Sequence, residues 1–129
     1  MKALLDTHAF LWWVGDRATQ LSARAIETIE DPAIDVYVSA VTGAEVSWKA
    51  ALGRLELPAP AERYVPDRIG RHRFLALSVE LAHALRAGSL PVIHRDPWDR
   101  LLVAQAQLES MPIVSADPLI GRYDVDVIW

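Results

Sequence analysis

Short apolar runs alternate along this chain with longer stretches in which apolar residues recur every three or four positions. The short runs have the length of buried strands, whereas the longer pattern is that of amphipathic helices. Strands are predicted at residues 2–5, 36–40, 74–77, 113–115 and 125–128. Strands that alternate with helices and are apolar throughout are typical of a parallel sheet covered on both faces. The predicted fold is a three-layer α/β/α sandwich with a central, mainly parallel sheet of four to five strands.

Residues with N-capping side chains precede four of the predicted helices. They are Ser22, Thr42, Ser78 and Asp96. Glu45 stands three residues after Thr42, which is the spacing of a capping box. Pro97 then occupies the first position of the last predicted helix. The segment of residues 61–72 also has a helical pattern, but Pro66 within it is predicted to kink or split the helix.

The size and composition of the chain indicate one packed domain. With 129 residues and 52% hydrophobic side chains, we expect residues 1–129 to form a single domain. The absence of cysteine excludes disulfides and thiolate chemistry, and it is compatible with a reducing compartment. Asp6 and His8 interrupt the apolar start of the chain, so no export signal is predicted. Because no apolar run is long enough to cross a bilayer, we expect a cytoplasmic protein without a membrane segment.

The charge balance restricts the kinds of partner. A net charge of −4 argues against broad electrostatic attraction to nucleic acid. Local basic patches remain open, because all of the 13 basic residues except Lys2 and Lys49 are Arg. The arginines of residues 63–73 are interpreted as a solvated helix face, with contact to phosphates as the alternative. The tryptophans are assigned to core or interface positions, because stacking on a base would require exposed indole rings.

Four acidic residues fall at positions that a parallel sheet would bring to one edge. Asp6 ends the first strand, Glu45 lies one turn into the helix after the second, and Asp117 follows the fourth. Asp99 lies in the first turn of the last predicted helix. In open parallel sheets, ligands bind beyond the carboxyl ends of the strands. We therefore expect these four side chains to converge.

Each of these acids also has a structural interpretation. Asp6 and Asp117 stand where a helix cap would, Glu45 completes the capping box, and Asp99 lies three residues after Asp96. An acid at a helix N-terminus stabilises by about 0.3 to 1 kcal/mol and needs no further function. Capping does not require the four positions to share one end of one sheet. Both interpretations are open for each acid singly, and the set together favours a site.

The chemistry of a converged set of carboxylates points to a metal. Carboxylates held close together repel one another unless a cation or hydrogen-bond donors compensate them. With no Cys and no regularly spaced His, the acids select a hard cation such as Mg²⁺ or Mn²⁺. One or two such ions activate a water molecule and stabilise the leaving oxygen of a phosphodiester. Such a site needs no protein nucleophile.

Four neighbouring residues have more than one interpretation. They are Thr7, Asp96, Ser115 and Arg100. The hydroxyls either orient the acids by hydrogen bonds or complete strand turns. Asp96 either caps its helix, holds water or assists a metal, and Arg100 either forms an ordinary ion pair or contacts a site carboxylate or a phosphate. His8 and His94 are assigned packing or hydrogen-bonding roles, because they lack metal-ligand spacing.

Three blocks of sequence carry a family resemblance. They are DTHAFLWW at residues 6–13, SAVTGAEVSWKAALGRLELP at residues 39–58 and HRDPWDRLLVAQAQLESMPIVSADPLIGRYDV at residues 94–125. In this order they resemble the conserved blocks of PIN-domain ribonucleases, and more closely those of VapC-type toxins of bacterial toxin–antitoxin pairs. The resemblance extends along nearly the whole chain, its last block is specific, and residues 58–90 add little to it.

The resemblance implies a function for the acidic residues. The family's acidic quartet, which binds the metal and is catalytic, corresponds to Asp6, Glu45, Asp99 and Asp117. The implied cofactor is Mg²⁺ or Mn²⁺, and the implied reaction is endonucleolytic cleavage of RNA by an activated water. Members of this family are commonly homodimers and are held inactive by an antitoxin protein, so both partners are expected here.

Two other classes of function stay open at this point. One is a non-catalytic α/β binding or regulatory module, either a degenerate PIN domain or a receiver-like domain. A receiver would need a phosphoacceptor Asp on its third strand and a Lys late in the sheet, whereas the lysines here are Lys2 and Lys49. The other is a PIN nuclease outside toxin–antitoxin systems, which includes a nuclease that acts on DNA.

Overall fold

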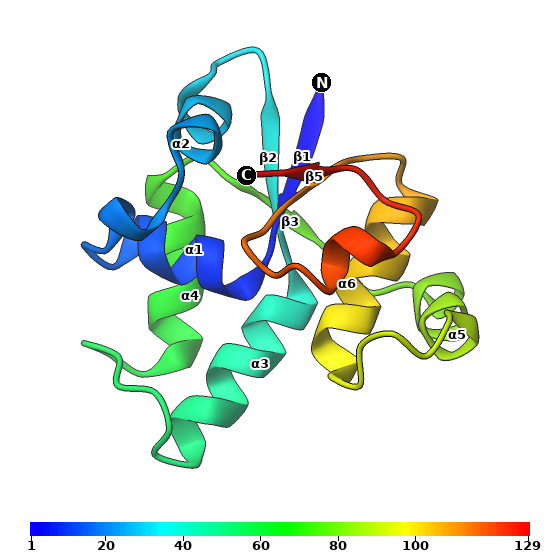
Figure 1. Cartoon of the computed structure of the whole chain (residues 1–129). Helices are drawn as coiled ribbons and strands as arrows, with labels where there is room; N and C mark the ends of the chain where they lie inside the picture. The colour runs from blue at the N-terminus through cyan, green and yellow to red at the C-terminus, as the bar shows by residue number, and fades with distance from the viewer.

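A five-stranded parallel sheet forms the centre of the molecule (Figure 1). The computed structural model describes residues 1–129, and β1 (Lys2–Leu5) is the central strand. Strands β2 (Asp35–Ser39) and β3 (Leu75–Leu77) lie on one side of it, and β4 (Ile113–Val114) and β5 (Val127–Ile128) lie on the other. The strand order is β3-β2-β1-β4-β5, and every pairing is parallel.

Helices flank this sheet on both faces, which confirms the predicted α/β/α sandwich. The α-helices are α1 (Thr7–Val14), α2 (Ala23–Glu30), α3 (Ala40–Ala51), α4 (Ala61–Arg71), α5 (Leu81–Ser89) and α6 (Pro97–Leu108). Two short 3-10 helices are η1 (Ala18–Gln20) and η2 (Ile120–Arg122). None of the helices has both the length and the apolar composition that a membrane span requires.

The alternation of side chains along β1 divides the core into two clusters. Ala3 and Leu5 face a cluster that includes buried residues of α1, α2 and α4. Leu4 enters a second cluster with buried residues of α5 and α6. All three side chains are fully buried, and burial of a leucine stabilises the fold by about 1.5 to 3 kcal/mol. This two-sided burial explains why the strand has no polar face.

The register of the sheet brings three strand ends level with one another. Leu5, the last residue of β1, is paired with Val38 of β2 and Val114 of β4. The chain N-terminus marks the other end of β1 in Figure 1, so Asp6, the start of α3 and the loop after β4 all lie at the opposite edge. This edge is where the predicted acids were expected to meet.

The cap of α3 differs from the prediction. Ser39, the last residue of β2, accepts a hydrogen bond from the backbone N–H of Val41 at 2.9 Å and caps the helix. The helix therefore begins at Ala40, so Thr42 is already inside it and the predicted Thr42–Glu45 capping box is wrong. The physical reason is that the strand passes into the helix without a connecting loop. Glu45 consequently has no capping role.

The predicted cap of α5 is wrong, and α4 is not split at Pro66. Helix α5 is capped by Glu80 rather than by Ser78, whose backbone carbonyl instead accepts a hydrogen bond from Gln105 Nε2 at 3.1 Å. Helix α4 continues through Pro66 as one helix and is not split. Pro66 removes a single intrahelical hydrogen bond, to the carbonyl of Glu62, and both residues are exposed. Tertiary contacts outweigh the local preference in both cases.

Candidate metal centre

Asp6 joins the central strand to α1 and is almost entirely buried, with 3% of its surface exposed. Its Oδ1 accepts a hydrogen bond from the backbone N–H of Ala9 at 2.8 Å, so it caps α1 as one of the two interpretations predicted. Burial raises the pKa of Asp6, and hydrogen bonds from the Ser115 side chain and from the Ala9 backbone oppose that effect. Asp117 adds to the rise through its negative charge. Asp6 is therefore both a cap and a member of a buried charged group.

Glu45 lies on α3 and is also 3% exposed. Its Oε2 accepts a hydrogen bond from Lys49 Nζ at 2.5 Å, one helical turn further along. Its Oε1 is buried and has no hydrogen-bond partner. An unsatisfied buried acceptor costs about 1 to 3 kcal/mol, and more when it is charged. This oxygen therefore has an unused capacity to bind a positively charged group.

Asp99 and Asp117 lie on either side of one imidazole nitrogen. His94 Nε2 is 2.8 Å from Asp117 Oδ2 and 3.1 Å from Asp99 Oδ2. Asp99 belongs to the first turn of α6, and Asp117 lies three residues beyond β4. The ligand atoms of these three residues all lie within 4.8 Å of one another. The three side chains thus form one compact cluster of potential ligand atoms.

The electrostatics of Asp99 connect all four predicted acids. Burial raises the pKa of Asp99 most, the negative charges of Asp96, Glu45 and Asp6 add to the rise, and His94 opposes it, so that the pKa lies at about 7. The charges of Glu45 and Asp6 are therefore close enough to act on Asp99. In the same way, the charge of Asp117 acts on Asp6. The tertiary structure brings together the four acids that the strand pattern placed at one edge. Four negative charges in so buried a site require a counter-charge.

The tautomer of His94 is fixed by the backbone. Nδ1 of its ring accepts a hydrogen bond from the N–H of Asp96 at 3.2 Å, and a backbone N–H can only donate. The proton of the neutral ring is therefore on Nε2, which donates to Asp117 Oδ2 and lies 3.1 Å from Asp99 Oδ2. The hydrogen-bonding role predicted for His94 is thus observed, but its place among the acids was missed. Only its position five residues before Asp99 could have indicated it.

Arg100 holds the segment that leads to His94. Its guanidinium donates to the backbone carbonyls of Ala87, Leu90 and Pro91 at 2.7, 3.0 and 2.9 Å. The N–H of His94 donates to the hydroxyl of Tyr123 at 2.7 Å. Arg100 forms no ion pair, so the expected pairing with a carboxylate is not observed. The reason is that its donors are used on carbonyls left free at the end of α5.

The other three candidate residues occupy different positions around the acids. Ser115 is buried next to Asp6, and its hydroxyl accepts the backbone N–H of Asp117 at 3.0 Å, so it contacts two of the four acids. The Thr7 hydroxyl lies 3.2 Å from the hydroxyl of Thr42 and joins α1 to α3. Asp96 caps α6 by accepting the N–H of Trp98 at 2.8 Å. Of the three, Ser115 has the geometry of a residue that orients acids.

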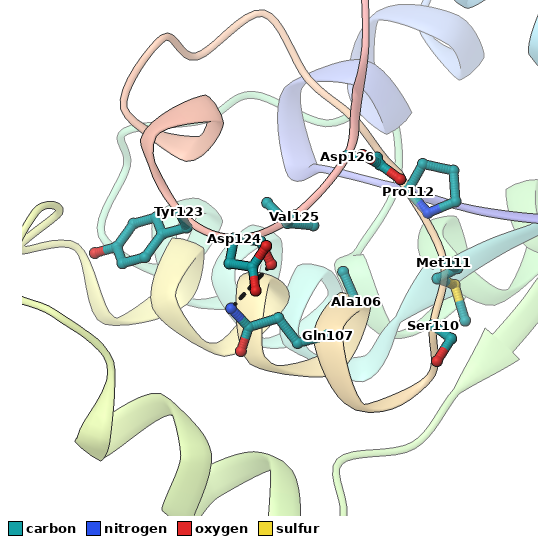
Figure 2. A pocket seen from close by; sticks show the side chains of 9 residues that line it. All are labelled: Ala106, Gln107, Ser110, Met111, Pro112, Tyr123, Asp124, Val125 and Asp126. Atoms are coloured by element: carbon teal, nitrogen blue, oxygen red, sulfur yellow. Dashed lines mark hydrogen bonds between the residues drawn. The ribbon is translucent and has the colours of Figure 1, made fainter.

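A pocket of about 370 Å³ lies away from this centre (Figure 2). Pro112 and Asp126, which directly precede β4 and β5, belong to its lining, so it lies at the amino ends of the strands. Gln107 donates there to the backbone carbonyl of Asp124 at 3.1 Å, as the dashed line in Figure 2 shows. Ligands of parallel sheets bind at the other edge. This pocket is therefore separate from the acidic centre.

The residues of the acidic centre fit a hard divalent cation. Mg²⁺ and Mn²⁺ prefer carboxylate oxygens, and Asp6, Glu45, Asp99 and Asp117 supply them from one sheet edge. The unpartnered Oε1 of Glu45 is the independent indication that a cation belongs there. His94 contributes a hydrogen-bond donor in this arrangement. The centre therefore combines four potential oxygen ligands with one N–H that orients two of them.

Comparisons with known proteins agree with this architecture. The PIN domain family matches residues 3–126. Among solved structures, the chain resembles VapBC2 from Rickettsia felis bound to a DNA fragment from the promoter, with a TM-score of 0.70, 14% identity, and coverage of 98% of this chain and 97% of that one. It also resembles a toxin–antitoxin complex from Klebsiella pneumoniae, with a TM-score of 0.65, 18% identity, and coverage of 98% of this chain and 96% of that one. For FitAcB from Neisseria gonorrhoeae the TM-score is 0.61 and the identity 21%, with coverage of 97% of this chain and 95% of that one. No curated protein matches the chain.

Proposed function

This chain belongs to the PIN domain family, and on that premise we propose that it is a metal-dependent endoribonuclease, the toxin of a toxin–antitoxin pair. The observation that carries the proposal is the convergence of four acids at one sheet edge, together with a buried Glu45 oxygen that has no partner. Residues 1–129 would act as a single nuclease domain. A receiver-like signalling domain is excluded by the family, and β3 of this chain contains no Asp.

The roles of the residues follow from their positions. Asp6, Glu45, Asp99 and Asp117 would hold Mg²⁺ or Mn²⁺, and the cation would activate the attacking water and stabilise the leaving oxygen of the phosphodiester. Asp6 is the N-cap of α1 directly after the central strand, and Glu45 lies on α3 directly after β2. Ser115 and His94 would orient the carboxylates by hydrogen bonds. Lys49 donates to one oxygen of Glu45 and would leave the other free for the cation.

Two protein partners belong to this proposal. An antitoxin is supported by the fold shared with chains from toxin–antitoxin complexes. A homodimer is supported by the outer face of α5, where Leu81 and Leu85 are 76% and 67% exposed. Exposed aliphatic residues that cluster on one helix are typical of protein interaction surfaces. A cytoplasmic location agrees with the absence of cysteine.

Cleavage of RNA by purified protein tests the proposal. The wild type is incubated with single-stranded RNA and Mn²⁺ or Mg²⁺, beside Asp6→Asn and Asp99→Asn, with Asp124→Asn in the remote pocket as the matched control. We expect cleavage by the wild type and the control, and a loss of at least about 100-fold in both site variants, because each removes a ligand charge. Undiminished cleavage by both variants would refute the assignment. A wild type that binds no Mn²⁺ in calorimetric titration would instead indicate a degenerate, non-catalytic member of the family.

A further inference from the structure

A second pocket, of about 290 Å³, opens directly beside the acidic centre. We call it the α1–α3 pocket, because its lining residues come from α1, α3 and the segments that follow them. Six of them matter here: Thr7, His8, Trp12, Arg17, Lys49 and Arg54. Thr7 directly follows Asp6 in the chain, and Lys49 donates to Glu45. Two residues of the pocket lining are therefore immediate neighbours of two of the four acids.

Three cationic side chains line the α1–α3 pocket in a protein of net charge −4. None of the ion pairs in the structure involves Arg17 or Arg54. The arginine side chains that donate hydrogen bonds within the protein are those of Arg71, Arg86 and Arg100. The guanidinium groups of Arg17 and Arg54 thus retain all their donors. A free guanidinium has the fork geometry that binds a phosphate through two hydrogen bonds.

The α1–α3 pocket also contains an aromatic surface. His8 and Trp12 lie one turn apart on α1, with ring centroids 5.5 Å apart and planes inclined by 37°. Trp12 is partly exposed, and its ring packs against that of Trp129, with the ring centroids 6.1 Å apart. Aromatic rings of this kind stack on unpaired nucleotide bases. The pocket thus has cationic groups for phosphate and a rigid aromatic surface for a base.

We propose that the α1–α3 pocket binds the nucleotide next to the cleaved phosphodiester of single-stranded RNA. Arg17 and Arg54 contact its phosphate, and the rings of His8 and Trp12 contact its base. The inference rests on the proposed nuclease function and specifies how an acidic protein holds its substrate. A single strand is favoured over a duplex, because the bases of a duplex are stacked on one another and do not reach an aromatic side chain. An acidic peptide would meet the same cationic side chains but would leave the aromatic surface of His8 and Trp12 without a base to stack on it.

RNA binding at several salt concentrations tests this inference. A short fluorescent single-stranded RNA is titrated with protein in Ca²⁺ and followed by anisotropy, for the wild type and for the double variant Arg17→Ala with Arg54→Ala. The matched control is Arg24→Ala with Arg86→Ala, which changes the net charge equally at exposed positions outside the pocket. We expect the pocket variant to bind at least about 10-fold more weakly than the control. Its slope of log affinity against log salt should fall by about 0.7 for each lost phosphate contact.

Single substitutions at Trp12 test the aromatic part. Trp12→Ala should weaken RNA binding by about 5-fold or more, and Trp12→Phe should restore most of the affinity, since a smaller ring still stacks. If Trp12→Phe restores the thermal stability of the protein but not its affinity for RNA, then Trp12 only packs on Trp129 and the aromatic part of the inference is wrong. Titration with Mn²⁺ should give the same affinity for the arginine variants as for the wild type, because the acids are unchanged.

The outcomes separate this inference from the proposed function. If the wild type cleaves RNA and the pocket variant binds RNA as tightly as the control, the inference is wrong and the nuclease stands. If the pocket variant keeps its RNA affinity and loses affinity for an antitoxin protein, the pocket is a protein-binding surface and the inference is also wrong. If the wild type neither binds nor cleaves RNA, the proposed function has failed.

Discussion

The backbone N–H of Asp96 donates a hydrogen bond to Nδ1 of His94, and this one bond decides what the imidazole does. Because Nδ1 accepts, Nε2 must carry the proton, and it donates to the carboxylate of Asp117 and lies in contact with that of Asp99. A histidine that ligates a metal shows the reverse arrangement, in which its second nitrogen donates to an acceptor. His94 is therefore placed to orient two acids rather than to bind the cation itself.

Variants of His94 distinguish these two roles. We expect His94→Ala to weaken Mn²⁺ binding by about 10- to 100-fold, the usual effect of losing a residue that orients metal ligands. His94→Gln should retain most of the affinity, because its amide N–H lies near the position of Nε2. Both affinities are measured by calorimetry. Electron paramagnetic resonance of bound Mn²⁺ with ¹⁵N-labelled histidine should show no directly bonded nitrogen, and a strong ¹⁵N coupling would make His94 a ligand.

Metal-free protein should become less stable as the pH rises toward 7, because of Asp99. Its folded pKa of about 7 exceeds the ordinary value of 3.8, so between these values the folded state binds more protons than the unfolded state. The free energy of unfolding therefore falls across that window, by about 4 kcal/mol at most, and Asp99 adds no further change above it. Urea denaturation in EDTA at pH 5 and pH 8 measures the fall. Asp99→Asn should remove most of it, and an equal fall in that variant would assign the effect to other groups.

Binding of Mn²⁺ should be coupled to loss of a proton from Asp99. Below pH 7 the cation competes with that proton, so its affinity should rise by about tenfold per pH unit and level off above pH 7. Calorimetry in buffers of different ionisation enthalpy counts the protons released, and about one is expected at pH 6. An affinity that stays constant between pH 5.5 and 7 would show that Asp99 is not a ligand.

Replacement of Arg100 should loosen the segment before His94. Arg100→Ala leaves the carbonyls of Ala87, Leu90 and Pro91 without their donor, and we expect a loss of about 2 to 4 kcal/mol in the free energy of unfolding. Hydrogen exchange of residues 87–94 should accelerate in the same variant. Arg86→Ala, which removes a single exposed hydrogen bond, is the control and should change stability by less than about 0.5 kcal/mol. Unchanged exchange in Arg100→Ala would contradict the role assigned to the guanidinium.

The exposed face of α5 should mediate self-association. Leu81→Glu combined with Leu85→Glu should convert a dimer to a monomer in analytical ultracentrifugation, because two buried charges would face each other across the interface. Leu52→Glu changes an exposed leucine at the C-terminal cap of α3 and is the control. A wild type that sediments as a monomer at high concentration would remove the homodimer from the proposal.

The sequence by itself determined the sandwich fold and the four acids. Both depend on a periodic pattern: apolar strands that alternate with helices form a parallel sheet, and a parallel sheet places all its carboxyl strand ends at one edge. The positions of Asp6, Glu45 and Asp117 after their strands are local in the chain. The cap at Asp96 was equally predictable, because capping depends on hydrogen bonds between neighbouring residues.

Only the tertiary structure decided what surrounds those acids. His94 is 23 residues from Asp117 and 29 from Tyr123 along the chain, and the loop that brings them together is set by carbonyl contacts of Arg100. The missing partner of Glu45 and the pocket beside it likewise depend on how α1 packs against α3. Contacts of this kind are made between segments distant in sequence, and no local preference of the backbone specifies them.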